Sequence, residues 1–341
     1  MKKKLLLTLL AVITAVLCGL SVSACTKSAD GMKFKKDGNG YIVTSADKDA
    51  TEIEIPAEFE GKPVIGIGDK AFYDCEDLKK VTIPDSVTKI GELAFGFCKY
   101  LNTVKIGNGV TEIGYRAFFD CERLMSIEIP ANVTKIGGRA FDRCESLSSI
   151  TVKSGNTAYH SVDNCLIETA TKTLIAGCKN SVIPADGSVT TIAEAAFFGH
   201  EDLKTISIPE GVTEIGYQAF ANCNSLTEIT LPESLTSLGN SIFFGCERLK
   251  EVNIPDNVNK IGKDTFENCK VLETVTIGKS VTEIGETAFY HCDSLTEINY
   301  NGTKAEWKNI KKEKQWSDYT GDYTVQCTDG KLNKSGNEIV E

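Results

Sequence analysis

The sequence predicts a repeat solenoid: a right-handed α/β stack of 23-residue units, each with a β-strand and a short helical turn, and capping segments at the ends. Three observations predict it. A segment of the form Val-Thr-x-Ile-Gly recurs nine times at a step of 23 residues, apart from one step that contains 33 more. Each copy ends in alternating apolar and polar residues, and apolar residues three apart precede them. One such unit cannot bury its apolar faces alone, whereas stacked units can. Units 1 to 9 begin at Val64, Val87, Val110, Val133, Val189, Val212, Leu235, Val258 and Val281.

Each unit is expected to contain two extended segments joined by a turn. The full pattern is V-T-x-I-G-x-x-A-F-x-x-C-x-x-L-x-x-I-x-I-P. Its last part has the period of two that is typical of a half-buried strand, and proline or glycine ends it. The first part predicts a shorter strand that ends at glycine. Between the two, the apolar spacing of three favours one or two turns of α- or 3₁₀-helix.

The segment before the repeats predicts export from the cell. Lysines at positions 2–4 precede an apolar run over residues 5–20, and small residues then lead to Cys25. This order is typical of a secretory signal peptide. The small residues before Cys25 resemble the lipobox of bacterial lipoproteins, and the resemblance implies that Cys25 carries a lipid anchor. Ordinary signal cleavage near Ala24 is the alternative.

Segments outside the nine copies are expected to cap or interrupt the stack. Thr303 and Glu306 have capping-box spacing, which predicts a short helix after the last unit. Tyr323 to Cys327 is expected to add a terminal strand. Within the insertion, two apolar runs flank residues 169–172 and predict a hairpin. The predicted divisions are a signal peptide (1–24), a polar tether (25–36), an N-terminal cap and half-repeat (37–63), repeats 1–4 (64–153), the insertion with its hairpin (154–188), repeats 5–9 (189–300) and a C-terminal cap (301–341).

Cysteine is abundant, and eight of the 13 cysteines share one position of the repeat. In the stack they form a row with one thiol per unit, which suits buried packing side chains. A straight row cannot supply the tetrahedral cluster that a metal needs, and parallel side chains give poor disulfide geometry. His200 has this position in unit 5 and is interpreted as a substituted packing residue. Cys165 and Cys178, in the insertion, are expected to be unpaired thiols, with a disulfide as the alternative.

The repeat resembles a known family. The string A-F-x-x-C-x-x-L-x-x-I-x-I-P is similar to the hallmark of the BspA-type leucine-rich repeat, and the match runs from Val64 to about Tyr300. The resemblance implies a leucine-rich-repeat-like solenoid on a bacterial surface protein. It also implies a host or neighbouring-cell protein or glycan as the partner, as in adhesion.

Composition and motifs argue against catalysis. The formal net charge is −10, from 37 basic and 47 acidic residues, which disfavours nucleic acid as a partner. Three histidines are too few for a histidine-rich metal site. The sequence contains no nucleophile elbow, zinc-protease motif, phosphate loop or dinucleotide fingerprint. We therefore expect a monomer that is not an enzyme and has no metal or cofactor.

Two surfaces are candidates for binding. One is the outward face of the longer strands, which changes from basic to acidic along the stack; a solvated sheet without a ligand is the alternative interpretation. The other is a row of large residues after the repeated phenylalanine, in alternate units. It predicts either steric interdigitation or an exposed aromatic stripe. The candidate residues are Lys80, Lys105, Glu128, Glu228, Glu251 and Glu297 on the strand face, and Tyr73, Phe119, Phe198, Phe244 and Tyr290 in the aromatic row.

Together these features predict a lipid-anchored cell-surface protein that binds macromolecules, as in adhesion, without catalysing a reaction. The alternative is a surface protein that captures glycans or peptides, or serves as a structural spacer, in nutrient acquisition.

Overall fold

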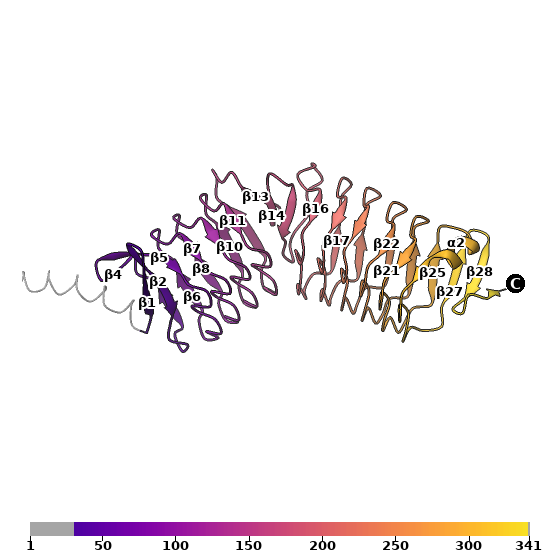
Figure 1. Cartoon of the computed structure of the whole chain (residues 1–341), viewed down its shortest axis with the longest axis horizontal. Coiled ribbons are helices and arrows are strands. Elements are labelled where there is room, and N and C mark those ends of the chain that lie inside the picture. The colour runs from indigo at the N-terminus through magenta and orange to yellow at the C-terminus, as the bar shows by residue number, and fades with distance from the viewer. Residues whose placement is uncertain (1–30, 340–341) are drawn as a thin grey trace, which may run out of the picture.

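The computed structural model describes residues 31–339, which form one elongated stack of rungs (Figure 1). The predicted signal peptide and Cys25 lie outside the described residues. Each rung carries a long strand on one side and a short strand on the other. The stack bends at the insertion, near β13 and β14 (Figure 1). No helix within the described residues is long and apolar enough to cross a membrane.

The long strands are the L-x-x-I-x-I segments. They pair in parallel at the repeat interval, so that Ile127 lies beside Ile150. Their side chains alternate between buried and exposed, because successive residues of a strand point to opposite faces. The long strands are β3 (Glu52–Glu54), β6 (Lys80–Thr82), β8 (Thr103–Lys105), β10 (Ser126–Ile129), β12 (Ser149–Val152), β17 (Thr205–Ser207), β19 (Glu228–Thr230), β21 (Glu251–Ile254), β23 (Thr274–Ile277) and β25 (Glu297–Tyr300).

The short strands are the V-T-x-I segments, and they also pair in parallel. Ile90, for example, lies beside Ile113. Glycine follows most of these strands and allows the next rung to approach closely: a Cβ added at Gly114 would lie 2.6 Å from the carbonyl carbon of Gly91. The short strands are β5 (Lys62–Ile67), β7 (Lys89–Ile90), β9 (Glu112–Ile113), β11 (Lys135–Ile136), β16 (Thr191–Ile192), β18 (Glu214–Ile215), β20 (Ser237–Leu238), β22 (Lys260–Ile261), β24 (Glu283–Ile284) and β26 (Lys311–Lys312).

The predicted helical turn between the two strands is wrong; the segment is a series of tight turns. Its amide groups alternate between partners. Phe119 N–H donates to Arg116 O of its own rung at 3.0 Å, whereas Phe118 N–H donates to Ala140 O of the next rung at 2.9 Å. The seventh and eleventh residues of each unit, such as Arg116 (φ 53°) and Asp120 (φ 60°), have positive φ. That conformation ends a right-handed helix at once, and the freed amides join neighbouring rungs instead.

The core is a ladder of identical side chains. The repeated phenylalanines stack in two columns, with ring centroids 4.9 Å apart for Phe72 and Phe95 and 5.0 Å apart for Phe197 and Phe220. The predicted cysteine row is confirmed as buried and free. From unit 2 onward its thiols donate to the carbonyl of the phenylalanine one rung earlier, as Cys98 Sγ does to Phe72 O at 3.1 Å. The row consists of Cys75, Cys98, Cys121, Cys144, Cys223, Cys246, Cys269 and Cys292.

The insertion separates two hydrophobic cores. β13 (Tyr159–Val162), β14 (Cys165–Glu168) and β15 (Thr173–Ala176) pair antiparallel, and β15 then pairs in parallel with β16. Successive side chains of β14 point to opposite sides, so Leu166 joins the core of units 1–4 while Cys165 and Ile167 join the core of units 5–9. Cys165 and Cys178 are both free and buried. We call this boundary between units 4 and 5 the seam.

Caps cover both ends of the stack. A hairpin of β1 (Lys33–Asp37) and β2 (Gly40–Ser45) precedes β5, and β4 (Glu58–Phe59) folds back on β5. At the other end, the predicted capping box is confirmed: Glu306 N–H donates to Thr303 Oγ1 at the start of α2 (Lys304–Asn309). The predicted terminal strand is confirmed as β27 (Thr324–Cys327), which pairs with β25. β28 (Gly330–Asn333) and β29 (Glu338–Ile339) complete this edge.

Candidate functional site

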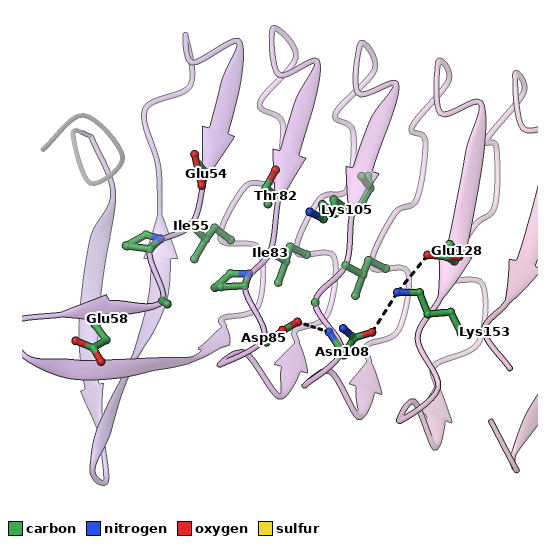
Figure 2. A pocket seen from close by; sticks show the side chains of 16 residues that line it. Glu54, Ile55, Glu58, Thr82, Ile83, Asp85, Lys105, Asn108, Glu128 and Lys153 are labelled. Atoms are coloured by element: carbon green, nitrogen blue, oxygen red, sulfur yellow. Dashed lines mark hydrogen bonds and ion pairs between the residues drawn. The ribbon is translucent and has the colours of Figure 1, made fainter. Parts of the chain in front are cut away.

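A groove of about 800 Å³ lies where the long strands of the first rungs end (Figure 2). We call it the strand-end groove. Its floor is the isoleucine that ends each strand, followed by proline or glycine at the turn. Residues from five successive rungs line it, and Glu58 of β4 closes its N-terminal side (Figure 2). The lining residues are Glu54, Ile55, Pro56, Ala57, Glu58, Thr82, Ile83, Pro84, Asp85, Val104, Lys105, Ile106, Gly107, Asn108, Glu128 and Lys153.

The long-strand ladder is interrupted within the span of the groove. β8 pairs with β6 but not with β10, and β10 begins a new ladder with β12. Val104 of β8 is only half-buried at this point, whereas the equivalent Val81 and Ile127 are buried. The short strands remain paired across the same rungs, from β7 through β9 to β11. The gap is therefore a local opening on one face of a continuous stack.

The groove is lined by charged side chains of both signs. Lys153 Nζ lies 3.3 Å from Glu128 Oε2 and donates to Asn108 Oδ1 at 3.1 Å. Asp85 Oδ1 accepts the Asn108 N–H at 2.6 Å, which fixes this corner (Figure 2). Lys105, near the middle of the groove, is exposed and forms no ion pair within residues 31–339. An unpaired ammonium group among hydrogen-bonded neighbours is available to an anionic group of a ligand.

The predicted strand-face residues occupy different places. Lys105 and Glu128 line the strand-end groove. Lys80 lies outside it, with its Nζ 3.9 Å from Glu52 Oε2. Glu228 lines a second depression of about 370 Å³ beside residues 181–183 of the insertion. Glu251 and Glu297 lie on the same face farther along the stack. Sequence reasoning missed Glu58, which lies in β4, and three loop residues that follow long strands, Asp85, Asn108 and Lys153.

The predicted aromatic row consists of half-buried rings that contact neighbouring rungs. In the first units it is continuous, because Phe97 contacts Tyr73 and Phe119 with both centroid distances at 5.2 Å. Phe198 lies under the guanidinium of Arg139, across the seam. Tyr290 contacts Tyr319 of the C-terminal cap at 5.1 Å, and Phe244 is half-buried beside the core ring of Phe243. Sequence reasoning missed Phe97, which sits one position after the predicted row.

His200 is a buried packing residue at the seam. Its side chain is 2% exposed, and Nδ1 has no hydrogen-bond partner in the described part of the chain. Burial lowers the pKa of His200 to about 4, so the imidazole is neutral at physiological pH. Nearby, burial raises the pKa of Asp142 to about 6, although Arg139 Nε lies 2.5 Å from its Oδ2. Within the described range, no group of three or more His, Cys, Asp or Glu residues is placed to hold a metal ion.

Stacked rungs with a strand, a turn series and a repeated leucine define this chain as a leucine-rich-repeat solenoid. The chain belongs to the BspA-type leucine-rich-repeat family: the family's sequence model matches residues 65–186 and 174–296, with six copies. No curated protein sequence matches the chain.

Solved structures share this fold. A leucine-rich cell surface protein from Faecalibacterium prausnitzii is 28% identical, with a TM-score of 0.61, and the match covers 83% of this chain and 96% of that one. The pneumococcal vaccine antigen PcpA is 21% identical, with a TM-score of 0.66 and coverage of 87% and 97%. A leucine-rich repeat protein from Eubacterium ventriosum is 22% identical, with a TM-score of 0.56 and coverage of 87% and 91%. The last two likenesses concern the fold alone. The family and the Faecalibacterium cell surface protein suggest a non-enzymatic binding role at the cell surface.

Proposed function

We propose that this chain is a lipid-anchored surface protein that binds a macromolecule of a host or neighbouring cell, as in adhesion, through the strand-end groove. The observation that carries the proposal is the groove itself, which spans five rungs and holds the unpaired Lys105 above an apolar floor. Its length along the stack suits an extended ligand better than a small molecule. The cell-surface description of the Faecalibacterium protein and the signal-like start of this sequence support the location.

Lys105→Glu is expected to weaken binding of the ligand by about tenfold or more. It replaces the unpaired ammonium group of the groove with a carboxylate, which repels an anionic group of the ligand. The soluble chain would be tested by interferometry against a panel of host matrix proteins and glycans. Lys80→Glu is the matched control, since Lys80 is an exposed lysine of the same face outside the groove. A panel that gives no binding, or equal losses in both variants, would contradict the proposal.

Cys25→Ser is expected to move the protein from the membrane fraction to the soluble exported fraction, because the lipid would have no attachment point. The measurement is fractionation of the producing bacterium with an antibody to the repeats. A conservative control is Cys18→Ser, which changes a cysteine within the apolar run of the signal. Membrane association that persists in Cys25→Ser would show that another segment anchors the chain.

A further inference from the structure

The turns of units 1–4 differ from the rest of the stack in their side chains. The chain has five arginines, and four of them lie within residues 116–143. Two are neutralised: Arg139 pairs with Asp142, and Arg143 Nε lies 2.6 Å from Asp120 Oδ1. Arg116 forms no ion pair within residues 31–339, and its Nε is buried without a hydrogen-bond partner. Its guanidinium charge also acts on the buried carboxyl of Asp142, where it opposes the rise of that pKa, but its remaining N–H groups form no ion pair and can bind an anion.

Aromatic rings hold that guanidinium in place. Arg116 Cζ lies 5.1 Å from the ring centroid of Tyr115 and 4.9 Å from that of Phe119. Tyr115 is 41% exposed, so the group lies at the surface. Phe119 is the last of three rings, with Tyr73 and Phe97, that follow one another along the stack at centroid spacings of 5.2 Å. We call Tyr73, Phe97 and Phe119 the aromatic track.

The backbone at Phe97 is unfavourable for the residue it carries. Its φ is 62°, in the left-handed region that bulky side chains avoid. At this eleventh position phenylalanine is the only apolar residue among the nine units; the others are Asp74, Asp120, Arg143, Gly199, Asn222, Gly245, Asn268 and His291. Most of these types tolerate positive φ. A strained residue that the fold does not require indicates a role outside folding.

The residue before Phe97 supports the same conclusion. Gly96 has the position that carries the large ring in units 1 and 3, and a Cβ added there would lie 2.8 Å from Leu93 Cδ2 and 3.4 Å from the ring of Tyr73. Phe97 departs from the repeat, whereas Gly96 follows the alternation and leaves room beside Tyr73. Together they keep the rings continuous through unit 2. Alternation alone would leave a gap at this rung.

We propose that the aromatic track, with Arg116, binds an acidic polysaccharide. Aromatic rings that follow one another along the stack complement a linear polymer whose sugar units also repeat. Sugar rings offer apolar C–H faces to aromatic rings, and a carboxylate or sulfate group would accept the N–H donors of Arg116. The track lies before the long strands begin, whereas the strand-end groove lies where they end. The proposal therefore concerns a second surface and does not rest on the groove.

The test measures binding of the soluble Cys25→Ser chain to immobilised polygalacturonate, heparin, neutral dextran, poly-L-glutamate and single-stranded oligothymidine. We expect binding to polygalacturonate, heparin or both, and none to dextran. The first two probes separate carboxylate from sulfate recognition. Equal or tighter binding to polyglutamate or to the oligonucleotide would overturn the ligand class.

Two variants use residues that this chain places at the same repeat positions. Arg116→Gln copies Gln218, and Phe97→Asn copies Asn222, which also has positive φ. Each is expected to weaken acidic-glycan binding about tenfold. Arg116→Gln should leave the melting temperature unchanged, because Arg116 forms no ion pair. Phe97→Asn removes a half-buried ring and should lower the melting temperature slightly, although asparagine tolerates the backbone at position 97. Lys80→Glu, which changes an exposed lysine outside both surfaces, is the control and should bind as the parent does. Undiminished binding in Arg116→Gln would overturn the site, even where Phe97→Asn proved unstable, and loss in Lys105→Glu alone would assign the glycan to the groove.

Discussion

Phe243→Ala is expected to lower the free energy of unfolding by about 3–5 kcal/mol, because it removes a whole ring from a closed column. Phe243 is fully buried and stacks between Phe220 and Phe266 at centroid distances of 5.9 and 5.4 Å. The rungs above and below are fixed by backbone hydrogen bonds, so they cannot collapse into the cavity. The measurement is urea unfolding followed by circular dichroism, with the midpoint compared at an unchanged slope.

Phe244→Ala is the matched control for this prediction. The two phenylalanines are adjacent in the same turn, but Phe244 is only half-buried. Its removal is expected to lower the free energy of unfolding by about 1 kcal/mol, in proportion to the smaller apolar area that it removes from water. Equal losses in the two variants would show that the stacked column does not carry the stability of units 5–9.

His200→Cys is expected to abolish the acid sensitivity that arises at the seam. Burial lowers the pKa of His200 from 6.5 to about 4, so between these values the unfolded chain binds a proton that the folded chain does not. Folding stability is therefore fully present above pH 6.5 and is lost as the pH falls toward 4, by about 3 kcal/mol for a shift of this size. Cysteine is the residue that the other eight units use at this position, and it stays neutral in this range.

Asp142 changes the folding stability with pH in the opposite direction, which gives the test a second expected result. Burial raises the pKa of Asp142 from 3.8 to about 6, so the folded chain binds the extra proton, and stability rises as the pH falls across this window. In the native chain the two effects partly cancel. In His200→Cys the effect of Asp142 remains alone, so acidification from pH 7 to pH 4.5 should stabilise that variant relative to the parent. Urea unfolding at both pH values checks this, and an identical pH response in parent and variant would contradict it.

The period of the sequence was sufficient to predict the stack, because each core position has one residue type in nearly every unit. The buried phenylalanine and cysteine rows, the capping box at Thr303 and the terminal strand all follow from local pattern. The prediction of a helical turn was wrong because an apolar spacing of three does not distinguish a helix from consecutive turns. What distinguishes them is the positive φ at the seventh and eleventh residues, and types as different as Leu93, Gln218 and Thr287 adopt it.

The surfaces were harder to predict than the core. Lys105 and Glu128 follow from strand alternation, but the groove around them also contains residues of the turns after the strands, which have no constant residue type in the repeat. Asn108 and Lys153 come together only because neighbouring rungs stack at a fixed spacing. The continuity of the aromatic track was missed for a related reason. Phe97 is at the eleventh position of its unit rather than the tenth, yet its ring lies between those of Tyr73 and Phe119.

In the tight turns, every second amide bonds to the next rung, and these bonds also determine how the molecule responds to a pull on its ends. Hydrogen bonds between rungs run along the axis of the stack, so their sets bear tension in series and can break one after another, beginning with the weakest. Each released rung frees 23 residues, which extend to about 75–80 Å, against a spacing of about 5 Å while folded. A chain held at one end and loaded at the other is thus an extensible spring, which lengthens stepwise and limits the force that reaches its point of attachment.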